Sequence, residues 1–120
     1  MSEGKINYDA LLHLDSRDEN VFKLVARNAR NYLDGLPDEK FELRVVANAG
    51  AVTLFTREHG DLRELILPLV ARGVRFMLCA NAIAENHIDR DSLWPECEII
   101  PAGLIEIVRS QRAGFAYIKP

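Results

Sequence analysis

Short apolar runs alternate with amphipathic, helix-like segments along the whole chain, and this alternation constrains the fold more than any other feature. An apolar run over residues 8–14 precedes helically spaced apolar residues that extend to Leu36, and this order recurs further along. Such short runs are typical of strands buried on both faces. Because strands separated by helices need crossover connections, the sheet should be mainly parallel with helices on both faces. The sequence therefore predicts an α/β fold, a three-layer α/β/α sandwich with a five-stranded sheet, in one domain over residues 1–120.

The expected elements follow from the same pattern. Strands are predicted at 8–14, 41–47, 74–79, 98–100 and 115–118. Helices are predicted from the Ser16 region to Gly35, from Asp61 to Gly73 and over 104–112, with a short helix starting near Ala51 and a helical turn within 80–94. The order of the strands in the sheet is left open.

Two helices carry signals that conflict. For the first, Ser16 and Glu19 have the spacing of a capping box, while Asp18 is an alternative N-cap. For the second, Asp61 is the expected cap, and Pro68 falls inside the helical pattern. Because an interior proline removes a hydrogen bond and clashes one turn back, a kink and a division into two shorter helices are both open.

Composition excludes several classes of protein. Apolar residues make up 48% of the chain and charged residues 28%, as in ordinary soluble proteins. The net charge is −3 with no basic stripe, so nucleic acid is not an expected partner. No apolar run approaches the roughly 20 residues needed to span a membrane, and the N-terminus lacks a signal-peptide core. Two cysteines are too few for a disulfide framework, so a cytoplasmic setting is expected.

Small and polar residues follow the predicted strands. In open α/β sheets ligands bind beyond the carboxyl ends of the strands. Asn48 and Gly50 follow the second strand, Cys79 and Asn81 the third, and Gly103 the fourth. We therefore expect these residues to line a shallow crevice.

Cys79 is the strongest candidate for chemistry. If a helical turn starts near Asn81, its free amides face the thiol and favour the thiolate, which is the reactive form in sulfur transfer. The alternative is a small buried hydrophobic residue at a strand end. Cys97 lies between Glu96 and Glu98, which disfavour a thiolate, so a structural role is expected.

His13 lies inside the first strand, between two leucines. It is either a core histidine with one hydrogen bond or a base for Cys79, if the first and third strands are neighbours. His59 and His87 are expected in exposed loops. Phosphate-binding glycine motifs, the hydrolase motif Gly-x-Ser-x-Gly and metal-ligand spacings are all absent, so neither a cofactor nor a metal is expected.

Five segments taken together resemble the DsrE/DsrF-like family of small sulfur-related proteins. They are residues 29–33, 45–50, 73–82, 101–108 and 111–118. The resemblance implies a five-stranded parallel sheet between helices. It also implies that the protein is a subunit of a sulfur-relay complex. Members of the family form homo-oligomers, including trimers and hexamers, or hetero-hexamers. The resemblance also implies a cysteine after the third strand that accepts sulfur as a persulfide. Cys79 matches that position.

The leading hypothesis is a sulfur carrier that works through Cys79, with sulfur donor and acceptor proteins as partners. Asn81 and backbone amides would stabilise the charged sulfur, and Asn48, Gly50 and Gly103 would line the crevice. The alternative is a non-catalytic oligomeric module that binds a small ligand or a protein, with an inert Cys79. A cysteine hydrolase with His13 as its base is the third hypothesis, and it lacks an evident orienting residue. A homo-oligomer is also expected from the wide apolar arc on the last helix, formed by Leu104, Ile105, Ile107 and Val108.

Overall fold

The computed structural model describes residues 5–120 and contains a five-stranded sheet in which every neighbouring pair is parallel. Residues 1–4, part of the N-terminal stretch searched for a signal peptide, lie outside it. The strands are β1 (Ala10–Leu14), β2 (Leu43–Ala47), β3 (Arg75–Cys79), β4 (Glu98–Ile100) and β5 (Ala116–Ile118). Their order across the sheet is β4-β3-β2-β1-β5. The predicted fold class is confirmed, and all five predicted strands are present.

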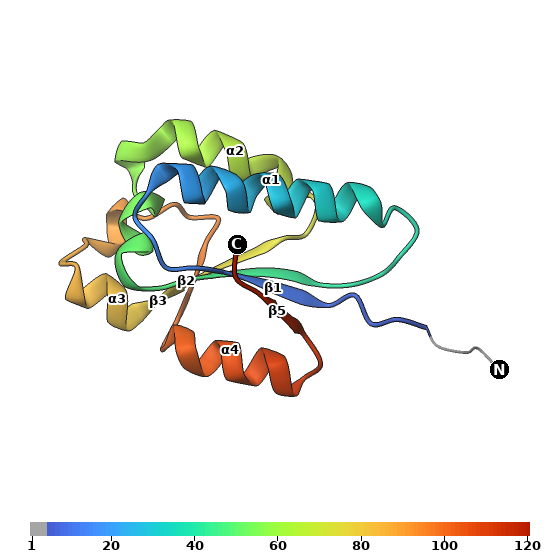
Figure 1. Ribbon diagram of the computed structural model, residues 1–120. Coiled ribbons are helices and arrows are strands. Elements are labelled where there is room, and N and C mark those ends of the chain that lie inside the picture. Colours follow the sequence, from blue (N-terminus) through green and yellow to red (C-terminus); the bar gives the residue numbers. More distant parts are fainter. Residues whose placement is uncertain (1–4) are drawn as a thin grey trace.

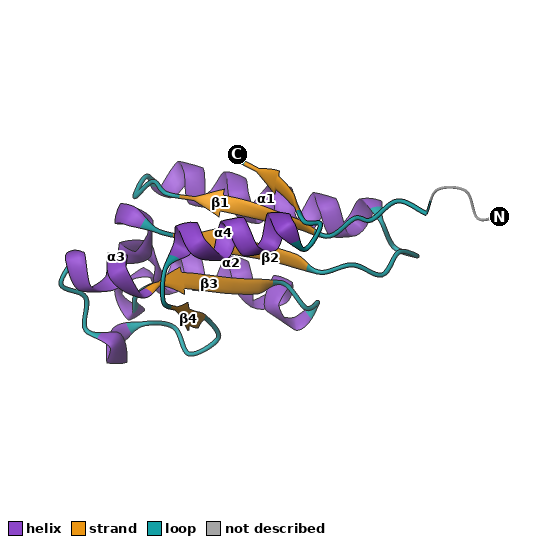
Figure 2. Cartoon of the chain, turned by 90° about the horizontal axis from the view of Figure 1, so that it is seen from below, coloured by secondary structure: helices purple, strands orange, loops and turns teal. Residues whose placement is uncertain are grey.

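Helices cover both faces of the sheet unequally. Helices α1 (Glu19–Gly35) and α2 (Gly60–Ala71) lie on one face, and α4 (Gly103–Arg112) lies alone on the other (Figure 1, Figure 2). The short helix α3 (Ala80–Glu85) begins directly after β3. Three 3₁₀ turns complete the structure, at Ala49–Phe55, Arg57–His59 and Arg90–Ser92. Within residues 5–120, no helix combines the length and apolar character needed to cross a membrane.

The two faces of the sheet have cores of different size. Under α1 and α2, the rings of Phe22, Phe55 and Trp94 pack with centroids 5.1–6.1 Å apart. The smaller core lies under α4, and its six members are Leu11, Val46, Met77, Ile100, Ile107 and Phe115. Because α4 has no neighbouring helix on its face, its outward apolar side chains stay exposed.

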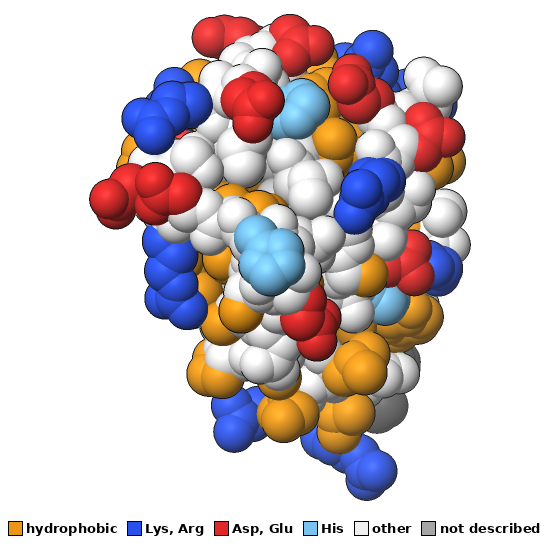
Figure 3. All heavy atoms as spheres, turned by 90° about the vertical axis from the view of Figure 1, so that its left-hand side faces the viewer, with side chains coloured by type: hydrophobic (Ala, Val, Ile, Leu, Met, Phe, Trp, Pro, Cys, Tyr) orange, Lys and Arg blue, Asp and Glu red, His pale blue; other side chains and the backbone are white. Residues whose placement is uncertain are grey.

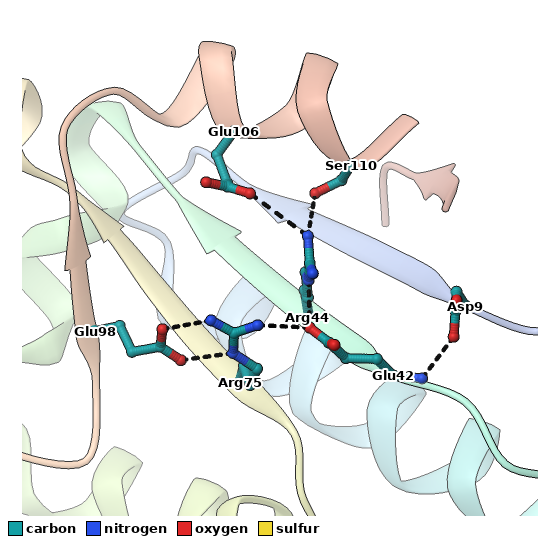
Figure 4. Close-up of polar contacts among 7 residues, drawn as sticks. All are labelled: Asp9, Glu42, Arg44, Arg75, Glu98, Glu106 and Ser110. Carbon is teal, nitrogen blue, oxygen red and sulfur yellow. Dashed lines mark hydrogen bonds and ion pairs between the residues drawn. The ribbon is translucent and has the colours of Figure 1, made fainter. Parts of the chain in front are cut away.

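A charged network joins the strands beneath α4, away from the carboxyl ends of the strands (Figure 4). Arg75 donates two hydrogen bonds to Glu98, at 2.9 and 2.7 Å, and a third to Glu42 at 2.8 Å. Arg44 also binds Glu42, and it donates to Ser110 of α4 at 2.8 Å. Polar contacts therefore tie β2, β3 and β4 to one another and to α4.

The start of α1 resolves one of the two conflicts in the sequence. Asp18 is the N-cap, and its side chain accepts a hydrogen bond from the Asn20 amide at 2.9 Å. The Ser16 hydroxyl instead accepts from the Asp18 amide at 3.0 Å, so the capping box with Glu19 does not form. The Asp18 carboxylate thus accepts from a free first-turn amide two residues further on, as an N-cap side chain does.

Helix α2 departs from its predicted start and runs unbroken through its proline. Asp61 lies in the first turn and is not the cap, because a 3₁₀ turn runs straight into the helix and puts His59 at the cap position. A single helix passes through Pro68, which rules out two shorter helices. Pro68 is exposed, and so is Glu64, whose carbonyl is the one that Pro68 cannot bond. Water can satisfy that carbonyl, which makes the proline tolerable there.

Candidate functional site

The carboxyl ends of β1, β2 and β3 bring three of the predicted site residues, His13, Asn48 and Cys79, to one edge of the sheet. His13 pairs in register with Val46, one position before the end of β1, and Asn48 directly follows β2. Figure 3 looks onto this edge and shows acidic, basic and histidine side chains distributed over it. The parallel sheet therefore places the candidate residues of separate segments at a common edge.

Cys79 occupies the junction between β3 and α3. It is the last residue of β3 and the N-cap of α3, with extended backbone torsions. The first-turn amides of a helix have no partners within it, so those of α3 are available near the thiol. The side chain is 6% exposed and belongs to the larger core. Cys79 thus combines a polar backbone setting with close apolar packing.

Gly103, the first residue of α4, closes the gap between β2 and β3. A Cβ atom built on it would lie 3.1 Å from Asn48 Cβ and 3.4 Å from Cys79 Cβ. The separation from Asn48 is shorter than ordinary contact, so a side chain on residue 103 would force Asn48 to move, and it would also touch Cys79. Because Gly103 has no side chain, Asn48, Cys79 and the start of α4 can lie together. The first-turn amides of α4 therefore lie near Cys79 in addition to those of α3.

His13 and Asn48 are linked by a hydrogen bond. His13 Nε2 lies 2.8 Å from Asn48 Oδ1, and His13 Nδ1 lies 2.6 Å from the Tyr117 hydroxyl oxygen. Since Asn48 Oδ1 can only accept, Nε2 carries the proton, and in the neutral ring Nδ1 accepts from Tyr117. Both hydrogen bonds of the buried ring thus go to Asn48 and Tyr117, and neither goes to Cys79.

The orientation of Asn48 leaves its amide nitrogen as a donor for the crevice. Within residues 5–120 no protein acceptor bonds this nitrogen, and no buried side-chain nitrogen or oxygen lacks a partner. The nitrogen is therefore open to solvent or to a ligand beside Gly103. A negatively charged group bound there would receive a hydrogen bond from it.

Gly50 lies outside this cluster, and Asn81 follows Cys79 by two residues. A Cβ atom on Gly50 would meet Arg17 Nε at 2.7 Å, so the glycine makes room for that side chain. Arg17 donates to Asn86 at 3.0 Å, and Asn86 donates to the carbonyl of Ala49 at 3.1 Å, which fixes the loop after β2. Asn81 is exposed on the first turn of α3.

Cys97 has the environment of a structural thiol. Burial raises its pKa, and the neighbouring Glu96 and Glu98 raise it further, to about 12. It is partly buried and packs against the larger core. The two cysteines are both free thiols.

Tyr117 is the site residue that sequence reasoning missed. It lies on β5, which pairs with β1, and Tyr117 is in register with Leu11. Since alternate residues share a face of the sheet, Tyr117 and His13 point to the same side. Only the strand order places β5 beside β1, and the sequence did not reveal that order.

An apolar surface adjoins the site. Leu104, Ile105 and Val108 of α4 are 64%, 55% and 52% exposed, and Tyr117 is 40% exposed. In Figure 3 hydrophobic side chains gather at the lower end of the viewed face, over α4. In the described part of the chain, no three His, Cys, Asp or Glu residues are grouped so that they could hold a metal ion.

Comparison with known proteins places this architecture in a family. The chain is similar over 95% of its length to a protein of unknown function from Methanobacterium thermoautotrophicum, MTH1491, with 32% identity, full coverage of that chain and a TM-score of 0.87. It is also similar in fold to the ychN protein from E. coli, with 17% identity, coverage of 94% of this chain and 99% of that one, and a TM-score of 0.73. No curated protein matches it. The model of the DsrE/DsrF-like family matches residues 4–120, and the chain therefore belongs to the DsrE/DsrF-like family.

Proposed function

We propose that the protein is a sulfur carrier that holds a persulfide on Cys79. The observation that carries this proposal is the position of Cys79 at the junction of β3, α3 and α4, beside Gly103. First-turn amides of both helices and the amide nitrogen of Asn48 are available there as donors to a negatively charged sulfur. Membership of a family associated with sulfur relay supports the same assignment.

The transfer conserves atoms and electrons. The Cys79 thiolate attacks the outer sulfur of a donor persulfide, and the donor's sulfur–sulfur bond breaks to release the donor as a thiolate. Cys79 then carries the outer sulfur until a thiolate of the acceptor protein attacks it and regenerates Cys79. Sulfane sulfur moves from one thiol to another, so no external oxidant or reductant enters.

Each neighbouring residue has a proposed part in this step. Asn48 and the first-turn amides, with Asn81 on the rim of the crevice, stabilise the charged outer sulfur. His13 holds Asn48 in place through the 2.8 Å hydrogen bond, and Tyr117 holds His13. For His13 to serve as a base instead, it would have to leave these partners. Gly103 keeps the approach free of a side chain, while Gly50 seats Arg17 in the loop after β2.

The burial of Cys79 favours a second candidate function. A thiol that is 6% exposed and packed in the core is also what an inert residue of a binding module would look like. In that case the crevice would bind a small ligand or a protein segment through Asn48 and the helix amides, with no covalent step.

Sulfur loading separates the two functions. The protein is incubated with a cysteine desulfurase and cysteine as the persulfide source, and its intact mass is measured. A carrier gains the mass of one sulfur atom in the wild type and in Cys97→Ser, while Cys79→Ser gains none. Absence of loading in the wild type, or loading that survives Cys79→Ser, would reject the carrier. A thermal melt of Cys79→Ser verifies that the variant is folded, since a hydroxyl in an apolar site carries a cost of its own.

We also propose that the protein works as a homo-oligomer in the cytoplasm, where a free thiol stays reduced. The exposed apolar side chains of α4 form the proposed contact between copies, and trimers or hexamers are the sizes that the family resemblance implies. Donor and acceptor proteins would meet the carboxyl edge next to this contact.

A further inference from the structure

A groove with an apolar floor lies between α1 and α2, on the face of the sheet opposite α4. Its volume is about 470 Å³. Its floor is formed by Ala26 of α1 and by Leu65, Pro68 and Leu69 of α2, and Leu65 is 44% exposed. An aliphatic floor of this kind accepts apolar side chains from another molecule.

Cations line the rim of the groove. Lys23, Arg27 and Arg30 are spaced three and four residues apart, which places them on one face of α1. All three are exposed, and within residues 5–120 none of them pairs with a carboxylate. On the α2 side the rim holds Arg72, which pairs with Asp34 at 2.8 Å, and a single carboxylate, Glu64.

The charge of the groove is opposite in sign to that of the chain as a whole. The net charge of the whole chain is −3, yet four cations and one carboxylate line this groove. By contrast, Arg44, Arg63 and Arg75 are each paired with glutamates of the same chain. Carboxylates of another molecule would therefore meet unpaired cations in this groove.

We propose that this groove docks an acidic segment of a partner protein. Apolar side chains of the segment enter between α1 and α2, and its carboxylates meet Lys23, Arg27 and Arg30. These three residues span about 10 Å along α1 at 1.5 Å per residue, a length that about two turns of a partner helix would match. No aromatic ring lines the groove for bases to stack on, which favours a protein segment over a nucleic acid.

The position of the groove leaves the other face of the molecule free. The groove lies in the layer of α1 and α2, whereas Gly103 and the exposed apolar residues belong to α4 on the opposite face. A docked segment can therefore coexist with contacts made through α4. The proposal does not depend on the chemistry of Cys79.

Fluorescence anisotropy with a defined probe tests the docking. The probe is a labelled 14-residue peptide of Glu, Leu and Ala with leucines at helical positions i, i+3, i+4 and i+7. The wild type should bind it, and the double variant Arg27→Glu with Arg30→Glu should bind about tenfold more weakly or worse, because two attractions become repulsions. Leu65→Ser should weaken binding several-fold, and added salt should weaken it in the wild type.

The matched control variant, Lys40→Glu with Arg90→Glu, reverses the charge of two exposed side chains outside the groove. It should bind the peptide as tightly as the wild type does. Amide chemical shifts verify that every variant is folded and should show peptide-induced changes in α1 and α2. Equal binding by the Arg27→Glu, Arg30→Glu variant would overturn the proposal. Equal binding of a peptide in which every Glu is replaced by Gln would also overturn it. The same holds if the protein does not bind the peptide but binds a single-stranded oligonucleotide or phosphatidylglycerol vesicles in a way that depends on Arg27.

Discussion

The two cysteines have contrasting surroundings, although both precede or end strands that are neighbours in the sheet. Cys79 is buried at a helix start with unpaired backbone donors, whereas Cys97 is partly buried and lies between two glutamates. Amide donors and carboxylates act in opposite directions on a thiolate. The proposed chemistry is therefore assigned to Cys79 and not to Cys97.

Alkylation of the native protein should consequently label Cys79 first. With a pKa of about 12, only about one Cys97 thiol in 10⁴ is ionised at pH 8, and its labelling should rise about tenfold for each added pH unit. Pulsed treatment with iodoacetamide followed by peptide mapping measures both rates. Faster labelling of Cys97 at pH 7 would contradict the assignment of Cys79.

At this scale the sequence predicted the chemical type of each site residue better than its contacts. It placed Cys79, Asn48 and Gly103 at strand ends, and the structure brings these three together. It could not predict that His13 would bond both Asn48 and Tyr117, because those residues are 35 and 104 positions away from it.

At the scale of secondary-structure elements, the approach of α4 to β2 and β3 depends on Gly103. Gly103→Ala should destabilise the protein by about 1–2 kcal/mol, since the new methyl group lies 3.1 Å from Asn48 Cβ, which is closer than ordinary contact. It should also slow sulfur loading, because the same methyl group narrows the approach to the thiol.

Gly60→Ala is the matched control for this variant. Gly60 is the first residue of α2, and a Cβ atom there meets nothing within 4 Å. This substitution should be neutral or stabilising by up to about 1 kcal/mol, because alanine restricts the unfolded chain. Urea unfolding measures both variants, and equal stabilities for them would contradict the close packing described at Gly103.

Element types were predictable because their signals are local, while exact ends depended on packing. Gly73, with a positive φ of 98°, follows the end of α2 as predicted. The predicted start of the same helix, with Asp61 as its cap, was wrong because a 3₁₀ turn continues into the helix. At Pro68 a kink and a division into two helices were both open, and its exposed position, which only the packed structure reveals, explains why a single helix continues.

At the scale of the whole molecule, the exposed apolar face of α4 predicts association of copies. Light scattering at micromolar concentration should give a mass that is a multiple of 13.5 kDa. Leu104→Ser with Val108→Ser should reduce that mass, whereas Leu65→Ser, at an exposed position on the opposite face, should leave it unchanged. A monomeric wild type would refute the prediction.

The charged network predicts how stability responds to acid. Hydrogen bonds from Arg44 lower the pKa of Glu42, and hydrogen bonds from Arg75 lower the pKa of Glu98. A carboxylate whose pKa is lower in the folded state stabilises the fold above its unfolded pKa of about 4.3, and that stabilisation is lost as the pH falls through the folded pKa. Acidification from pH 6 to pH 3 should therefore lower the unfolding midpoint.

Arg75→Met tests the origin of this effect. It removes the partner of Glu98 and one partner of Glu42, so it should cost about 1 kcal/mol at pH 7 and flatten the fall in stability between pH 5 and pH 3. Urea unfolding across this pH range provides the measurement. An unchanged slope would assign the acid sensitivity to other groups.

Strand order was the largest feature that the sequence did not predict. Each strand was recognisable from its own apolar residues, but the order β4-β3-β2-β1-β5 depends on how helices pack between them. Both the Tyr117–His13 contact and the charged network follow from that order, which explains why neither was foreseen.

The pairing of β5 with β1 has a consequence for how the chain is made. Ala116 lies opposite Ala10, so β5, which is synthesised after the other four strands of the sheet, covers one edge of β1. Until then β1, whose five residues are all buried in the finished sheet, presents an apolar strand with unpaired backbone groups. Such an edge readily recruits another chain. A form of this protein that lacks β5 should therefore aggregate more readily than the folded chain, because the uncovered edge of β1 can pair with a strand of another chain.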